Sequence, residues 1–217
     1  LHRVDRRQRQ MCIRDRVRDL KNFHQQMNLE GRFIVTYAGA HGPSNDLGVV
    51  LRAAEMLKEH KDICFLLVGD GKEKKALQNQ AKQLELENIK FIPPVPKLEM
   101  NHILAASDAC IAILKPLEWY KTTYPNKVFD YMAAGRPVVL AIDGVIREVV
   151  ENANAGIFVQ PGNPQALAQA ILFLYKNPER AQQLGENGRN YVIKHYDRGK
   201  IAEQFIHLLE EMVGKNE

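Results

Sequence analysis

The sequence predicts an α/β protein built on a doubly wound parallel sheet of about six strands. Short apolar runs alternate along the chain with longer segments whose apolar residues recur at helical spacing. The run from Ile63 to Val68 is apolar throughout, which is typical of a parallel strand covered on both faces. Glycine or proline ends most of these runs. Strands that alternate with helices in this way form parallel sheets with helices on both faces.

Each element has its own local signal. The first strand, 33–38, is rich in β-branched and aromatic residues and ends at Gly39. Prolines halt the third strand, and Gly135 ends the helix at 126–134. The predicted strands are 33–38, 63–68, 89–92, 109–114, 137–141 and 156–159. The first predicted helix carries Val50, Leu51, Ala54 and Leu57 on one face. The next helices are predicted at 72–86, 97–106, 126–134 and 145–151.

Three further helices are predicted at the C-terminal end. Asn163 and Pro164 form an N-cap and first-turn pair for a helix with Leu167, Ala170, Ile171 and Leu174 on one face. Helices at 178–194 and about 198–213 follow. The last one carries an apolar stripe of Ile201, Phe205, Leu208, Leu209 and Met212, and packing in the core is the ordinary interpretation of such a stripe. If the segment on which this helix packs is missing, Phe205, Leu208, Leu209 and Met212 are instead expected to be partly exposed.

Composition excludes several classes of protein. The chain has 217 residues, of which 45% are hydrophobic and 26% charged, as in an ordinary globular domain. It has no run of 18 apolar residues, so no membrane-spanning helix is expected. Its three cysteines lack CxxC spacing, and Cys64 and Cys110 lie in apolar runs as small hydrophobes. Residues 1–18 contribute +5 to a net charge of +4, which leaves −1 for the remainder and removes the compositional case for nucleic-acid binding.

The first residues carry an unusual string. Residues 6–16 resemble a translated sequencing adapter, and a basic arm or a targeting peptide explains this string less well. We therefore interpret residues 1–16 as an artefactual, disordered tail and treat the chain as a fragment.

Ligands of a doubly wound sheet bind beyond the carboxyl ends of its strands. The first such loop contains Gly39 and Gly42, which allow a ligand close to the backbone, and it precedes a helix N-terminus that favours anions. It lacks the G-x-G-x-x-G fingerprint of dinucleotide sites. The lone G-x-G at Gly69 and Gly71 favours a tight turn over a ligand site.

The loop 115–126 is the most informative. Lys127 falls in the first turn of a predicted helix, where a cation is unfavourable unless an anion lies between it and the free N–H groups. A bound phosphate and a solvated lysine both stay open as interpretations. Asp130 shares a helix face with Lys127, and the two either contact phosphate and hydroxyl groups or form an ordinary surface ion pair.

A resemblance to a known family rests on these segments. The string from Tyr124 to Val139 resembles the donor-site motif of retaining family 4 glycosyltransferases, which often reads P-S-K-x-x-E-x-M-A-x-G-x-P-V. Four further segments are similar to family motifs: Tyr37–Gly39, Val68–Gly71, Phe91–Pro96 and Ala155–Asn163. The similarity as a whole extends over about residues 30–213. The nearest similarity is to bacterial transferases that build surface polysaccharide from UDP-linked N-acetylamino sugars.

The resemblance implies the GT-B fold, in which two Rossmann-like domains face each other across a cleft. This chain is similar only to the C-terminal, nucleotide-sugar-binding half. We therefore expect 17–30 to end an interdomain linker and 31–217 to form one Rossmann-like GT-B half-domain with C-terminal helices, with the N-terminal acceptor domain missing. The implied partners are a nucleotide-sugar donor, that domain, and a lipid-linked or saccharide acceptor. The implied location is cytoplasmic, or peripheral at the inner face of the membrane.

The resemblance also implies roles for residues. The family's ribose-binding carboxylate falls on Asp130, whereas its first glutamate falls on Thr122 and its phosphate-binding Arg and Lys fall on Ala40 and Asn45. Lys127 is then the residue expected to bind the diphosphate with its positive charge. Lys127 and Thr123 are the expected catalytic residues. His41 either donates to phosphate or sugar or has a structural role. The expected donor-binding residues are Gly39, His41, Gly42, Asn45, Gly69, Pro94, Val95, Lys121, Thr122, Tyr124, Pro125, Asn126 and Asp130.

The implied reaction is transfer from a UDP-sugar with retention of anomeric configuration, without metal or other cofactor, since the body of the chain contains no Asp-x-Asp pair. A sugar-nucleotide epimerase of the same architecture is one alternative, and activity without an acceptor would reveal it. A nucleotide-binding module without catalysis is another, and for the fragment alone we expect UDP binding without transfer. A dehydrogenase is disfavoured because the glycine fingerprint is absent.

Overall fold

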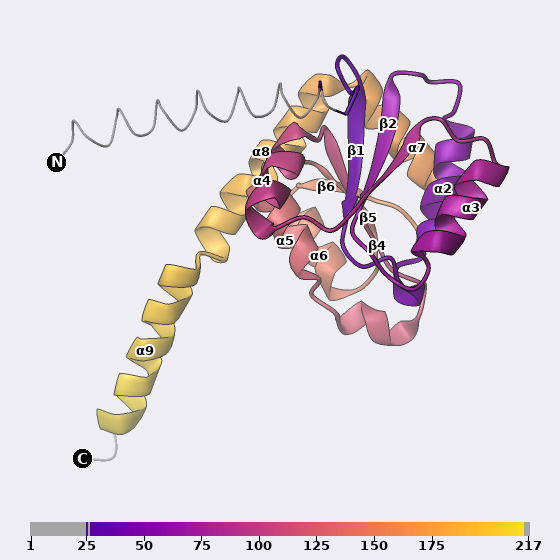
Figure 1. Ribbon diagram of the computed structural model, residues 1–217. Coiled ribbons are helices and arrows are strands. Elements are labelled where there is room, and N and C mark those ends of the chain that lie inside the picture. The colour runs from indigo at the N-terminus through magenta and orange to yellow at the C-terminus, as the bar shows by residue number, and fades with distance from the viewer. Residues whose placement is uncertain (1–24, 26, 215–217) are drawn as a thin grey trace.

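A computed structural model describes residue 25 and residues 27–214 (Figure 1). The interpretation of residues 1–16 as an artefactual tail lies outside the described residues, as do most of those assigned to the linker end. Leu29, which belongs to the predicted linker, is fully buried in the core, so packing extends upstream of the predicted boundary at residue 31.

The sheet has six parallel strands in the order β3-β2-β1-β4-β5-β6, which confirms the predicted fold class. Every strand falls within one residue of its predicted bounds at each end. The strands are β1 (Phe33–Ala38), β2 (Ile63–Val68), β3 (Ile89–Ile92), β4 (Ala109–Ile113), β5 (Val138–Ala141) and β6 (Gly156–Phe158). The uniformly apolar strand β2 is buried along its whole length, because β1 and β3 flank it and helices cover both faces.

The α-helices follow the predicted order, and two short 3-10 helices are added. The segment expected as a loop at 115–126 contains a 3-10 helix, η2 (Glu118–Thr122), closed by bonds from Tyr120 N to Leu117 O and from Thr123 N to Tyr120 O. A second short helix, η1 (Pro43–Asn45), lies in the first loop. The α-helices are α2 (Leu47–Met56), α3 (Lys74–Gln83), α4 (Lys97–Ala106), α5 (Asn126–Ala133), α6 (Val145–Asn152), α7 (Pro164–Lys176), α8 (Pro178–His195) and α9 (Arg198–Gly214).

Helices cover both faces of the sheet (Figure 1). Apolar residues of α2, α3 and α7 pack on one face and those of α4, α5 and α6 on the other, which produces two core clusters. Cys64 and Cys110 are buried in the second cluster, as expected. The predicted cap at Asn163 is present, since its side chain accepts a hydrogen bond of 2.9 Å from Ala166 N.

Helix α9 departs from the core interpretation. Figure 1 shows it leaving the domain as a separate arm, and four residues of its stripe are about half exposed: Phe205, Leu208, Leu209 and Met212. The side chain of the fifth, Ile201, lies outside the described part of the chain. The core interpretation is therefore wrong for these four, and the expectation of partial exposure is confirmed, because helical spacing reveals an apolar face but not whether the same domain covers it. Among the described residues, no helix is long and apolar enough to cross a membrane.

Candidate functional site

A crevice is expected where the strand order reverses, between β1 and β4. Strand β1 pairs with β2 over six residues, but it pairs with β4 only at Val35 and Thr36. Beyond Thr36 the two strands are no longer paired, and their connections run to opposite faces of the sheet, β1 to α2 and β4 to α5. This reversal is the place where doubly wound sheets bind ligands.

Tyr131 fills the position next to the end of β1. Its buried hydroxyl accepts a 2.9 Å hydrogen bond from Ala38 N and donates one of 3.2 Å to Ala38 O. Burial raises the pKa of Tyr131, so the hydroxyl stays neutral and keeps its proton for donation. The side chain thereby ties α5 to the last residue of β1 and sets where the N-terminus of α5 lies.

Lys127 lies in the first turn of α5, as predicted, but it is not a solvated lysine. Its Nζ donates to the Tyr37 hydroxyl at 2.9 Å and to Asn45 Oδ1 at 3.5 Å, and lies 4.1 Å from the centroid of the Tyr37 ring. The Tyr37 hydroxyl in turn donates to Ala40 O at 2.8 Å. Burial lowers the pKa of Lys127 to about 8, since these neutral partners replace only part of the hydration of its ammonium.

The glycines of the first two loops are explained by close packing. A Cβ on Gly39 would lie 2.7 Å from Lys127 Nζ, and its φ of 149° also favours glycine. A Cβ on Gly69 would collide with Gly39 O, and one on Gly71 would collide with His41 O. Gly69 and Gly71 are therefore needed for close contact between the two loops.

His41 lies inside the protein rather than on the loop surface. Its side chain is fully buried, and its ring centroid lies about 6 Å from those of Tyr37 and Phe91. Within the part of the chain that the structure describes, neither ring nitrogen has a hydrogen-bond partner. Burial, followed by the charge of Lys74, lowers the pKa of His41 to about 4. This placement favours the structural role for His41 over a contact with phosphate or sugar.

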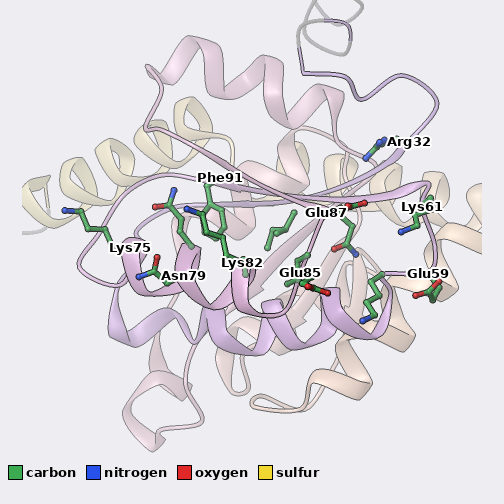
Figure 2. A pocket seen from close by; sticks show the side chains of 15 residues that line it. Arg32, Glu59, Lys61, Lys75, Asn79, Lys82, Glu85, Glu87 and Phe91 are labelled. Atoms are coloured by element: carbon green, nitrogen blue, oxygen red, sulfur yellow. The ribbon is translucent and has the colours of Figure 1, made fainter.

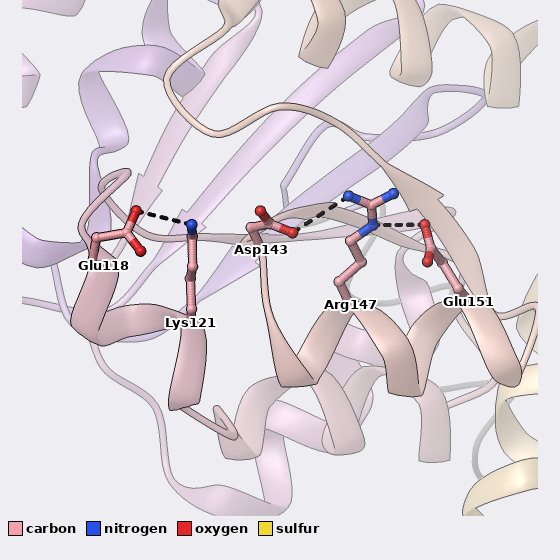
Figure 3. A network of polar contacts seen from close by, with 5 residues as sticks. All are labelled: Glu118, Lys121, Asp143, Arg147 and Glu151. Atoms are coloured by element: carbon pink, nitrogen blue, oxygen red, sulfur yellow. Dashed lines mark hydrogen bonds and ion pairs between the residues drawn. The ribbon is translucent and has the colours of Figure 1, made fainter.

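The remaining predicted site residues lie in several different places. Gly42 and Asn45 lie in the first loop beside Lys127, whereas Pro94 and Val95 follow β3. Lys121 is directed elsewhere, since it forms a 2.9 Å ion pair with Glu118 (Figure 3). The others lie along η2, along α5 or between these two helices: Thr122, Thr123, Tyr124, Pro125, Asn126 and Asp130. Thr122 Oγ1 donates a hydrogen bond of 3.1 Å to Trp119 O. Tyr124 and Asp130 are exposed.

Sequence reasoning assigned no role to Tyr37 or Tyr131, which hold the site together. A tyrosine inside an otherwise apolar strand was an available signal, because a buried hydroxyl usually has a hydrogen-bond partner. The sequence did not show which partner each hydroxyl has.

A large cavity lies away from this crevice. It measures about 1100 Å³ and opens near the amino ends of β2 and β3, beside α3. Figure 2 shows side chains of both charge signs around it, among them Lys61, Lys82, Glu85 and Glu87. Ligands of parallel sheets bind at the opposite ends of the strands, so we do not place the functional site there.

Comparison with known proteins identifies the family to which the chain belongs. Residues 19–191 match the family model described as glycosyl transferases group 1. N-acetyl-alpha-D-glucosaminyl L-malate synthase of Bacillus anthracis is 26% identical over 157 residues, 72% of this chain and 39% of that protein. The chain spans about half or less of the length of the curated relatives that it matches.

Solved structures show the same fold. Anabaena HepE, crystallised with UDP, superposes with a TM-score of 0.79 at 23% identity, over 89% of this chain and 52% of that one. The C-terminal domain of the group 1 glycosyl transferase LpcC from Francisella tularensis superposes with a TM-score of 0.70 at 20% identity, over 80% of this chain and 91% of that one. The structure is thus a Rossmann-like GT-B half-domain, and the chain belongs to the glycosyl transferases group 1 family.

Proposed function

We propose that this chain is the donor-binding half of a glycosyltransferase that uses a UDP-sugar. The observation that carries the proposal is the position of Lys127. Lys127 belongs to the first turn of α5, and its ammonium contacts Tyr37 at the end of β1 and Asn45 in the first loop, on the side of the sheet where the strand order reverses between β1 and β4. A diphosphate in that crevice would receive both the lysine charge and the helix N–H groups.

The same arrangement suits the chemistry of glycosyl transfer. Charge develops on the diphosphate as the sugar leaves it, and preorganised N–H donors and a cation stabilise that charge. Asp130, three residues after Lys127 and exposed on α5, is proposed to accept hydrogen bonds from the ribose hydroxyls. The first-loop residues Gly39, Gly42 and Asn45 are proposed to contact the phosphates. HepE was crystallised with UDP and with UDP-glucose, which supports a uridine donor.

The finer assignments belong to the same proposal. We infer retention of anomeric configuration, metal-independent transfer, a UDP-N-acetylamino sugar as donor and a bacterial surface polysaccharide as product. A relative named as a putative colanic acid biosynthesis glycosyl transferase, WcaI of Escherichia coli, supports that class of product. Because the chain aligns with about half of each relative, we propose that a further domain of a longer protein holds the acceptor.

Calorimetry with UDP, UMP, uridine and NAD tests the proposal on the chain as it stands. We expect affinity to increase from uridine to UMP to UDP, because each phosphate adds contacts to Lys127 and to the α5 N-terminus. Binding of NAD without binding of UDP would overturn the proposal. Conversion of a UDP-sugar to its epimer without any acceptor would replace it with the epimerase alternative.

A further inference from the structure

A second, smaller cavity lies at the carboxyl ends of the other three strands. It measures about 170 Å³, comparable with the volume of a single hexose ring, and is enclosed by the loops that follow β4, β5 and β6. These strands adjoin the crevice between β1 and β4 along the same edge of the sheet. The polar residues that line the cavity are Lys115, Glu118, Tyr120, Lys121, Asp143 and Gln160.

The charged groups around this cavity are already held in place (Figure 3). Lys121 forms a 2.9 Å ion pair with Glu118, and Arg147 contacts Asp143 at 3.4 Å and Glu151 at 2.8 Å. The two walls also touch, because the backbone of Gly144 lies so close to the carbonyl of Lys121 that no side chain fits between them. Asp143 is therefore oriented by Arg147, whereas Glu118, whose side chain is 84% exposed, stays accessible to a ligand.

The lining favours a neutral polyhydroxylated ligand over an anion. Its two lysines are balanced by two carboxylates, and carboxylate oxygens repel phosphate but accept hydrogen bonds from hydroxyl groups. The Gln160 amide can both donate and accept. Carboxylates and amides around a pocket of this size suit the vicinal hydroxyls of a sugar.

An aromatic surface extends from the cavity. Tyr120 lines it, and the Tyr120 ring lies edge-on to that of Trp119, with centroids 6.1 Å apart and an angle of 65°. Trp119 is 66% exposed, which is unusual for so large an apolar side chain. An exposed indole offers a flat apolar face with a polar N–H at its edge, and the C–H face of a pyranose can stack on it.

We propose that this cavity is a subsite for one sugar unit of a saccharide acceptor, with Trp119 as the stacking surface and Glu118, Asp143 and Gln160 as hydrogen-bonding partners. The inference rests on the proposed function and adds to it, since it places acceptor recognition partly on the donor-binding half. Strands β4 and β1 are neighbours, so a sugar held here lies along the same sheet edge as a donor between them.

Trp119 makes the inference directly testable, because it is the only tryptophan in the chain. With UDP at saturating concentration, Trp119 fluorescence is followed during titration with methyl α-glucopyranoside, N-acetylglucosamine or the disaccharide of N-acetylglucosamine. We expect a saturable change with at least one sugar, and none with glycerol or inorganic phosphate at equal concentration. A purely linear response to every sugar, or a saturable response to phosphate alone, overturns the subsite.

Variants locate the response. Asp143→Asn and Gln160→Ala should each weaken the sugar about tenfold, the effect of losing a hydrogen bond to a charged or well-placed group, and leave UDP affinity unchanged. Glu148→Gln makes the same chemical change as Asp143→Asn on an exposed position of α6 and should leave both affinities unchanged. In saturation-transfer NMR, Trp119→Phe should retain sugar binding and Trp119→Ala should lose it. Unchanged sugar affinity in both Asp143→Asn and Gln160→Ala overturns the proposal.

Failure of this inference differs from failure of the proposed function. If calorimetry shows UDP binding and no sugar binds, the subsite is wrong and the donor role stands. If a sugar binds but UDP does not, the donor role is wrong and the cavity is a carbohydrate site in its own right. If neither binds, both proposals are rejected.

Discussion

The ammonium of Lys127 and the hydroxyl of Tyr37, 90 residues apart in sequence, are joined by a 2.9 Å hydrogen bond. The contact links the first turn of α5 to the end of β1. Because Tyr37 also donates to Ala40 O, the bond positions the lysine relative to the loop that is proposed to hold the diphosphate.

Replacing this lysine should separate phosphate binding from nucleoside binding. We expect Lys127→Ala to cost roughly 1.5–3 kcal/mol in UDP affinity, the range for a charge-assisted hydrogen bond, and to change uridine affinity little. Calorimetry with both ligands measures the difference. Lys75→Ala removes an equal charge from exposed α3 and should change neither affinity. Equal losses for UDP and uridine in Lys127→Ala would contradict the phosphate assignment.

UDP binding should also depend on pH in the alkaline range. The pKa of free Lys127 is about 8, and a bound diphosphate favours its protonated form. Below pH 8 the lysine is already charged, so affinity should be level, whereas above pH 8 affinity should fall by up to about tenfold per pH unit. Calorimetry between pH 7 and 8.8 tests this. Lys127→Arg stays charged over this range, so its UDP affinity should not change with pH. If the UDP affinity of Lys127→Arg also fell above pH 8, a group other than Lys127 would be responsible for the pH dependence.

His41 should make the domain sensitive to acid. Its pKa is about 4 when folded and about 6.5 when unfolded, so between these values the unfolded chain binds more protons. Stability should therefore be full above pH 6.5 and fall by up to about 3 kcal/mol as pH decreases to 4. His41→Leu should remove this part of the pH dependence and stabilise the domain at pH 7.5, because two unpaired buried nitrogens disappear. Urea unfolding of the wild type and of His41→Leu, each at pH 7.5 and at pH 4, measures both effects. If the free energy of unfolding of His41→Leu fell with pH as much as that of the wild type, the assignment to His41 would be contradicted.

Two glycine-to-alanine changes should have opposite effects. Gly69→Ala should destabilise the domain by about 3 kcal/mol or more, because the methyl group collides with Gly39 O at a φ of 139°. Gly48→Ala should stabilise it by about 0.5–1 kcal/mol, since Gly48 is helical and its added Cβ meets nothing within 4 Å. Thermal unfolding compares them directly. If Gly69→Ala were neutral, the two loops could not be packed as described.

The exposed face of α9 should promote self-association. Phe205 and Leu209 are 59% and 45% exposed on the same arm of the molecule, and apolar patches of this kind associate in water. Sedimentation velocity should show concentration-dependent association that the double change Phe205→Gln and Leu209→Gln reduces. The unfolding temperature of the domain should not change, because the arm lies outside the core. A wild-type chain that remains monomeric at high concentration would argue against this role of the stripe.

Much of the fold was predictable because its signals are local. The apolar run of β2, the prolines after β3 and the glycine after α5 each end or begin an element without help from distant residues. The 3-10 helix η2 was missed because its turns depend on backbone bonds in a segment rich in proline and aromatic residues, where no periodic pattern exists. The spacing of the stripe on α9 predicted an apolar face and favoured its burial, whereas the expectation of a missing partner predicted the partial exposure that the structure shows.

The candidate site was predictable as a set of loops but not as a set of contacts. The rule for doubly wound sheets selects the loops at the strand ends, and the position of Lys127 in a first turn follows from the helix boundary. That His41 points inward, and that Lys121 pairs with Glu118 rather than joining Lys127, depends on how the loops pack on one another.

The sequence by itself determined the order of strands and helices, their bounds within about a residue for the strands, and the edge of the sheet at which ligands bind. These properties follow from hydrophobic periodicity and turn residues, which act over a few positions. Only the tertiary structure decided that Tyr131 holds α5 against the end of β1 and that Lys127 lies half-buried against Tyr37. Such contacts arise because the sheet order places β4, and with it α5, beside β1, which no local pattern encodes.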